Sequence, residues 1–180
     1  MTFTTSDYYA PPPLLEAIAF GSYSASYQAM QFDSLADLNA AFMYKLIGSI
    51  TNDNVGACTY SLFFGDSGGY DQVAANYSNQ SISGNAAAVN GARAASATLK
   101  TLAGGESMVF DVDVITVGDI PNFLILSAPD LTGGAIKLVN STITHAAFAN
   151  PVDRFEIYGS VADGIGVGSN YNLFANSVIG

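Results

Sequence analysis

The chain has 180 residues, the size of one domain, and only 11% of them are charged. Fifteen acidic and five basic side chains give a net charge of −10, which excludes nucleic-acid binding through a basic face and disfavours anionic membrane surfaces. Eleven Phe and ten Tyr in a 49% hydrophobic composition exclude a disordered chain, and no run of about 18 apolar residues, the length that spans a bilayer, is present.

Residues 1–16 are predicted to form an N-terminal arm. Two tyrosines lead through Ala10 into three consecutive prolines, which favour polyproline II and cannot join a central strand. We expect this arm either to be a disordered terminus or to dock on a neighbouring subunit. The second alternative assigns assembly contacts to Tyr8, Tyr9, Pro11, Pro12, Pro13 and Leu14. Because Met1–Asp7 has neither a basic nor an apolar stretch, we expect synthesis in the cytoplasm without a signal peptide.

The remaining residues, 17–180, are predicted to form a single β-rich domain with one inserted helix. Between Ala17 and Phe32, Tyr and Ala alternate with Ser and Gln, which is the period-two pattern of a strand. Ser34 and Asp37 then match a helix capping box, and apolar residues recur at helical spacing up to Leu46. These signals predict a helix over residues 35–47.

A strand at residues 57–64 and then a long loop are expected after the helix. Residues 65–96 are rich in Gly, Ala, Ser and Asn, and long loops in compact domains often form contacts. We therefore expect Tyr70 and Tyr77, which lie in this segment, to contact other subunits. Further strands are predicted at Met108–Val117, Asn122–Ala128, Ala135–Thr144, Arg154–Val161 and Asn170–Ile179.

The strand pattern indicates the fold class. About eight short strands, separated by glycine and proline turns, predict an all-β chain. The expected architecture is an antiparallel, jelly-roll-like sandwich or barrel that carries the inserted helix at 35–47 and the long Gly/Ala/Ser/Asn-rich loop.

One glycine-rich segment is a candidate catalytic motif. Gly65-Asp66-Ser67-Gly68-Gly69 resembles the segment around the nucleophile of chymotrypsin-like serine proteases. In that family the histidine precedes the serine, whereas His145, the only histidine, follows Ser67. Cys58 is the only cysteine, so the disulfides of that family cannot form. A hairpin turn rich in glycine therefore explains the string better than a protease site.

Asp111 and Asp113 are the candidates for paired catalytic carboxylates. Two residues apart on a predicted strand, they face the same side at roughly 7 Å, a spacing that suits glycoside hydrolysis. The alternative, which we favour, is a solvent-facing polar row opposite apolar neighbours. There is no Cys/His cluster for zinc, and the Gly164–Gly168 run lacks the last glycine of a dinucleotide-binding fingerprint. We predict no catalytic residue, no cofactor and no metal site.

The sparse charge leads to the functional hypothesis. Over the roughly 8,300 Å² expected of a compact monomer of this mass, fifteen acidic and five basic residues leave about one charge per 400 Å², the size of the largest apolar patch usual on a monomer. We therefore hypothesise a non-enzymatic structural subunit of a large assembly, specifically a viral or phage capsid protein of the single jelly-roll type. It would reside in the virion or in an extracellular assembly, and it would contact copies of itself or other structural subunits. The alternatives are a glycan-binding lectin or adhesin module and, third, a small hydrolase that uses Asp111 and Asp113.

Overall fold

The computed structural model describes residues 16–35, 42–85, 88–95, 97–117, 120–127, 138–146, 148 and 150–177. The predicted arm contacts at Tyr8, Tyr9, Pro11, Pro12, Pro13 and Leu14 lie outside these residues. Within them the chain is all-β and its strands pair in antiparallel fashion, as predicted. The helical structure among the described residues is a single 3₁₀ turn, η3 (Ala74–Asn76).

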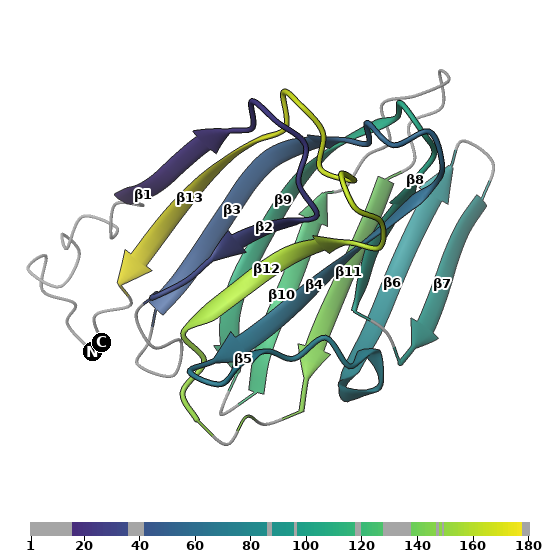
Figure 1. Ribbon diagram of the computed structural model, residues 1–180. Coiled ribbons are helices and arrows are strands. Elements are labelled where there is room, and N and C mark those ends of the chain that lie inside the picture. The colour runs from purple at the N-terminus through teal and green to yellow at the C-terminus, as the bar shows by residue number, and fades with distance from the viewer. Residues whose placement is uncertain are drawn as a thin grey trace, which may run out of the picture.

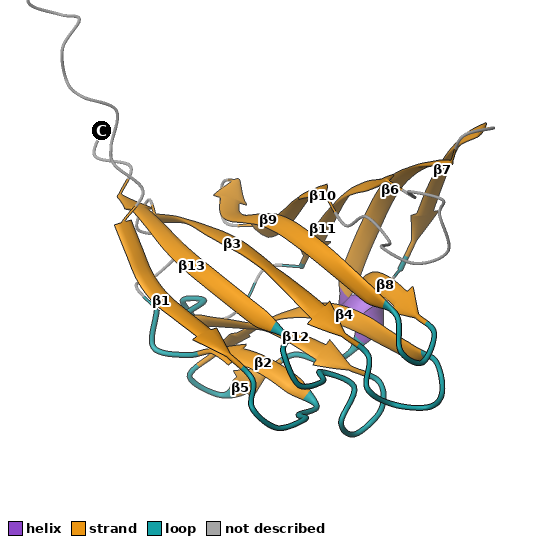
Figure 2. Ribbon diagram, turned by 90° about the horizontal axis from the view of Figure 1, so that it is seen from above, coloured by secondary structure: helices purple, strands orange, loops and turns teal. Residues whose placement is uncertain are grey.

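Two sheets lie face to face, as Figure 1 and Figure 2 show. The large sheet has eight strands in the order β1 (Glu16–Ser22), β13 (Asn170–Ser177), β3 (Phe42–Thr51), β9 (Ser107–Val117), β10 (Ile120–Ser127), β11 (Leu138–His145), β6 (Tyr77–Asn85) and β7 (Ala88–Ala94). The small sheet has the order β2 (Ala29–Phe32), β12 (Arg154–Gly159), β4 (Cys58–Asp66) and β5 (Gly69–Tyr70), and β8 (Thr98–Leu102) also pairs with β4.

Aromatic side chains join the two sheets through one core. Phe123 of β10 stacks on Phe64 of β4 with ring centroids 3.9 Å apart, and it meets Phe155 of β12 edge-on. Each fully buried side chain of this kind stabilises the fold by about 1.5–3 kcal/mol. The large sheet shows the expected alternation of faces. Phe110 and Val112 of β9 are buried, whereas Asp111 between them points to the opposite face.

The helix predicted over 35–47 is wrong where the structure describes it. Phe42–Thr51 forms β3, in which Tyr44, Leu46 and Ile50 are buried. The apolar residues that indicated a helix recur every four residues, and a spacing of four also places side chains on one face of a strand. Pairing with β13 and β9 on both sides decides the conformation.

The long loop predicted over 65–96 is also wrong, because most of it is strand. The segment contains β5, η3, β6 and β7, and β6 pairs with β11 from Gly84–Leu138 to Tyr77–His145. The sequence of this segment is mainly small and polar, so it carries little hydrophobic signal, and pairing with β11 places β6 and β7 at one side of the large sheet. Backbone hydrogen bonds rather than hydrophobic alternation therefore hold this hairpin in place.

The strand predicted from Ala17 to Phe32 is interrupted. It consists of β1 in the large sheet and β2 in the small sheet, and residues 23–28 cross between them. Tyr23 N–H donates to the Ser169 carbonyl, and Tyr27 forms an isolated bridge with Ile165. The strand expected at 57–64 and the five expected after residue 108 are confirmed, apart from a few residues at their ends.

Candidate functional site

The string that resembles a protease motif forms a turn between β4 and β5. The Asp66 carboxylate accepts hydrogen bonds from the Gly68 N–H at 2.7 Å and from the Asn150 amide at 2.9 Å. These bonds hold the pKa of Asp66 below its usual value, with Asn150 as the main cause. Gly69 has a φ of 118°, a conformation that glycine adopts readily. The turn explains the glycines without any role for Ser67 in catalysis.

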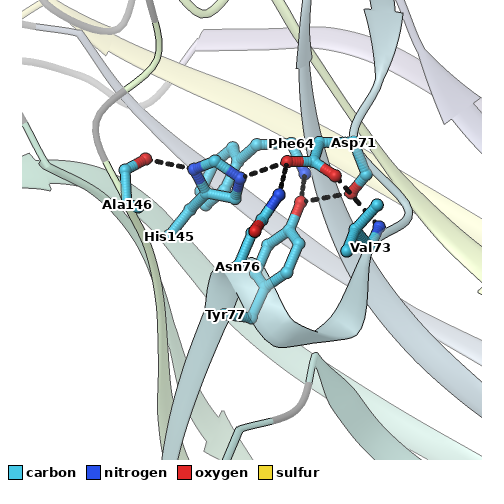
Figure 3. Close-up of polar contacts among 7 residues, drawn as sticks. All are labelled: Phe64, Asp71, Val73, Asn76, Tyr77, His145 and Ala146. Carbon is cyan, nitrogen blue, oxygen red and sulfur yellow. Dashed lines mark hydrogen bonds and ion pairs between the residues drawn. The ribbon is translucent and has the colours of Figure 1, made fainter.

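Both ring nitrogens of His145 contact other residues of the fold, as Figure 3 shows. Its Nε2 lies 2.8 Å from the Asp71 carboxylate, and its Nδ1 contacts the carbonyl oxygen of Ala146. The ring is 5% exposed and stacks on Phe148 with centroids 4.0 Å apart. Because both ring nitrogens have a partner, the imidazole has no free nitrogen with which to activate a hydroxyl nucleophile.

Asp71, Asn76, Tyr77 and His145 form what we call the Asp71 cluster (Figure 3). The Asp71 carboxylate accepts hydrogen bonds from the Asn76 amide at 2.6 Å, from His145 and from the Val73 N–H at 2.9 Å. Burial by itself raises the pKa of Asp71, but these hydrogen bonds outweigh it and hold the pKa below the usual value. The cluster ties the connection after β5 to β6 and β11.

Tyr77, a predicted assembly contact, lies inside the fold. Its hydroxyl donates to the Asp71 carbonyl and accepts from the Phe64 N–H, both at 2.8 Å. Its side chain is 1% exposed, and burial raises the pKa of its hydroxyl far above the usual value. The residue is therefore a structural link between β6 and β4, and its side chain is not available to another subunit.

Tyr70 lies at the surface, as its predicted contact role requires. It is partly exposed on β5, and its hydroxyl donates to the Asp33 carboxylate at 2.8 Å. The Arg154 guanidinium lies 3.7 Å from Asp33 and 2.8 Å from Asp153. The contact role of Tyr70 stays a prediction.

The Asp111 and Asp113 carboxylates do face the same side, but a lysine lies between them. Lys45 Nζ of β3 is 2.6 Å from Asp111 and 3.2 Å from Asp113. Partial burial lowers the pKa of Lys45, but the hydrogen bonds to both carboxylates raise it above its usual value overall. Both carboxylates are thus paired with one ammonium group, and this ion-pair contact is the role that the structure shows for them.

The outer face of the large sheet is the most extensive candidate surface. We define it as the side of the large sheet that points away from the small sheet, and no described element packs against it (Figure 2). Near the β1 edge it exposes Phe20, of which 81% is accessible, together with Ile18 and Ile47. The described charged side chains on this face are Lys45, Asp111 and Asp113, which neutralise one another in part.

A polar groove crosses the other half of the outer face. Two adjoining hollows of about 540 and 450 Å³ share Gln80 of β6 and Thr142 of β11. The lining combines hydroxyl and amide side chains with the apolar residues Ala94, Ala95, Ile82, Leu124 and Ile125, and no charged side chain is among the described lining residues. A groove of this size and composition suits an uncharged polar ligand.

Metal-ligand clusters and membrane-spanning helices are both absent from the part of the chain that the structure describes. They contain no group of three or more His, Cys, Asp or Glu side chains placed to hold a metal ion. They also contain no helix long and apolar enough to cross a membrane.

No protein-family model matches the chain, and no curated protein matches it. Among solved structures, the chain is similar to the CBM2 module of the evolved Dit of Lactobacillus casei BL23 phage J-1. The sequence identity is 14% and the TM-score is 0.38, over 92% of this chain and 82% of that chain. A similarity of this size transfers neither a fold nor a ligand to this chain.

Proposed function

We propose that this chain is a non-enzymatic structural subunit of a large assembly, of the kind that viral and phage coat proteins form. The observation that carries the proposal is the outer face of the large sheet, which is broad, poor in charge and apolar at its β1 edge. Soluble monomers rarely expose large apolar patches. Burial of this face against other subunits accounts for the composition of the chain.

The size of the outer face fits an interface. Eight strands, spaced by about 4.8 Å and about 20 Å long, span roughly 700 Å². A standard protein–protein interface buries about 800 Å² on each partner. Near the β1 edge, Phe20, Ile18 and Ile47 would supply the apolar and aromatic side chains that are enriched where an interface is fully buried.

We further propose a jelly-roll topology, on the basis of the strand pairing. Eight strands form one long hairpin that is folded over itself; in chain order they are β1, β2, β3, β4, β8, β9, β12 and β13. The first pairs with the last (β1–β13), the second with the seventh (β2–β12), the third with the sixth (β3–β9) and the fourth with the fifth (β4–β8). Pairing of β13 with β3 and of β12 with β4 wraps this hairpin into two sheets. Jelly rolls occur in viral capsid proteins and in lectins, so the topology supports both candidate functions.

The test compares two apolar-to-acidic substitutions in the full-length chain. Phe20→Asp places a charge on the outer face, and Val55→Asp places the same charge on a fully exposed residue of the β3–β4 loop. Light scattering after size-exclusion chromatography should show at least a tenfold weaker self-association for Phe20→Asp and no change for Val55→Asp. Equal behaviour of both variants would refute the outer face as the interface.

A glycan-binding module is the second candidate, and the polar groove is the observation that favours it. Its Ser, Thr, Asn and Gln side chains offer hydrogen-bond donors and acceptors to sugar hydroxyls. Binding of neutral glycans on an array, lost on Gln80→Ala together with Thr142→Ala, would support this candidate. Binding unchanged by those substitutions, or the absence of binding, would count against it.

A further inference from the structure

The structure holds a small pocket lined by tyrosines at the β1 edge. We call it the tyrosine pocket: it has a volume of about 230 Å³ and is lined by Tyr23, Tyr27, Tyr171, Gly21, Ser22 and Ser24. The Tyr23 ring lies 5.2 Å from that of Tyr27 and 6.3 Å from that of Tyr171, and the rings are tilted against one another. Tyr23 and Tyr171 are partly buried against the core, whereas Tyr27 is 49% exposed.

Hydrogen bonding separates these three tyrosines from four other tyrosines that the structure describes. The hydroxyls of Tyr60, Tyr70, Tyr77 and Tyr158 all make hydrogen bonds within the chain. Those of Tyr23, Tyr27 and Tyr171 make none with any residue that the structure describes. Burial, and then the neighbouring Tyr171 and Tyr27, raise the pKa of Tyr23 to about 12, so its hydroxyl keeps its proton at neutral pH. The pocket therefore presents phenol donors that the fold itself does not use.

A glycine gives the Tyr171 ring its place in the pocket. A Cβ atom on Gly21 would lie 2.9 Å from the Tyr171 ring, which is closer than carbon atoms normally approach. Gly21 pairs with Tyr171 across β1 and β13, so the ring can lie over the glycine backbone. Tyr171 also meets Phe32 of β2 edge-on with centroids 5.0 Å apart, which fixes the ring between the two sheets.

We propose that the tyrosine pocket binds the proline run Pro11–Pro13 from the N-terminal arm of a second copy of this chain. Polyproline II segments dock in grooves lined by aromatic side chains. Such a segment has no internal hydrogen bonds, so its carbonyl groups are free to accept from phenol donors. This inference rests on the proposed assembly function and names the contact through which neighbouring copies are joined.

Chain length explains why the prolines come from another copy. Glu16 to Ser22, the span of β1, covers about 20 Å at roughly 3.3 Å per residue. Pro13 lies three residues before Glu16 and Pro11 five, which at about 3.1 Å per residue gives reaches of only about 9 and 16 Å. The run would also have to reverse its direction at the start of β1. Gly21, the first pocket residue along the chain, lies about 17 Å from Glu16, so only Pro11 could come near it and the run as a whole falls short of the pocket of its own chain.

The experiment uses full-length chains and a photochemical cross-link. Tyr9→p-benzoylphenylalanine places a photoreactive group next to the prolines, and equal amounts of ¹⁴N- and ¹⁵N-labelled protein distinguish contacts between copies from contacts within one chain. After irradiation, mass spectrometry should find mixed-isotope cross-links at residues 21–27 or at Tyr171. The yield should fall at least tenfold on Tyr27→Ser, and equally on the triple change Pro11→Ser, Pro12→Ser and Pro13→Ser, but not on Val55→Ser.

The possible failures are distinguishable. Cross-links within one chain only, or between copies at residues away from the pocket, would overturn the arm–pocket contact while assembly itself stands. A yield insensitive to both Tyr27→Ser and the proline changes would overturn it equally. If a neutral oligosaccharide binds at Tyr27 and the proline changes have no effect, the pocket is a sugar site and the inference is wrong. Absence of any self-association in the same samples would refute the proposed function as well.

Discussion

Tyr77 and Tyr27 carry the same phenol in two different surroundings. In the Asp71 cluster, the Tyr77 hydroxyl has a donor and an acceptor from the fold and the side chain is 1% exposed. In the tyrosine pocket, Tyr27 is 49% exposed and its hydroxyl has no partner among the described residues. Hydrogen bonding of the hydroxyl, more than residue type, therefore separates tyrosines that stabilise the fold, such as Tyr77, from tyrosines that are available to a partner, such as Tyr27.

The largest effect is expected from a substitution in the Asp71 cluster, which contains Tyr77. Asp71→Ala removes the acceptor for Asn76, His145 and the Val73 N–H, and leaves the buried His145 without its carboxylate. We expect a loss of about 2–3 kcal/mol in the free energy of unfolding. For a chain of this size, that lowers the Tm by about 5–10 °C.

Thermal unfolding followed by circular dichroism measures this loss. Asp66→Ala is the matched control, since it removes a carboxylate with two hydrogen bonds at an exposed turn. Its effect should be less than half as large. Equal losses in the two variants would mean that the Asp71 cluster contributes no more than a surface turn.

The next effect compares the two tyrosines directly. Tyr77→Phe leaves the buried Phe64 N–H without an acceptor, which should cost about 1–2 kcal/mol. Tyr27→Phe removes a hydroxyl that the fold does not use, so its free energy of unfolding should stay within about 0.5 kcal/mol of the unaltered chain. Urea titrations of both variants provide the measurement, and a destabilising Tyr27→Phe would show that the tyrosine pocket is part of the structural core.

The strand predictions show what the sequence can and cannot indicate. Alternation of large apolar with polar side chains was sufficient to locate β4 and the strands from β9 onward, for example at Met108–Val117. It failed at β3, because apolar residues four apart fit a helix and a strand equally well. It also failed at β6 and β7, where small polar residues carry no hydrophobic signal and pairing with β11 decides the structure.

The candidate sites were still harder to foresee. Lys45 lies 66 and 68 positions before the carboxylates that it bridges, and only the β3–β9 register brings them together. Tyr171 of β13 meets Tyr23, which follows β1, because β13 pairs with β1 although the two strands are far apart in the sequence. Tyr77 was expected at the surface because its neighbours in sequence are polar, but those neighbours lie on an edge hairpin whose first residue reaches the core.

The smallest expected effect concerns acid. The pKa of Asp71 is lowered in the folded state, so the stability that it supplies is complete above about pH 5, more than one unit above the ordinary value of 3.8. That stability is lost as the pH falls through 3.8 towards the lower folded value, because the unfolded chain then binds the proton more readily. Asp66 shifts in the same direction and adds to the slope.

Urea titrations between pH 6 and pH 3 check this dependence. Asp71→Asn should reduce the slope of unfolding free energy against pH over that range, because one of the shifted carboxyl groups is gone. An unchanged slope would show that the hydrogen bonds of the Asp71 cluster do not influence the titration of its carboxylate.

Sedimentation equilibrium of the unaltered full-length chain at neutral pH tests the central claim most directly. The account predicts a mass that rises with concentration to several times the 18.7 kDa of one chain, and that falls on Phe20→Asp. A mass of 18.7 kDa at every concentration, unchanged by salt, would show that the outer face of the large sheet is stable in water without a partner, and would contradict the account.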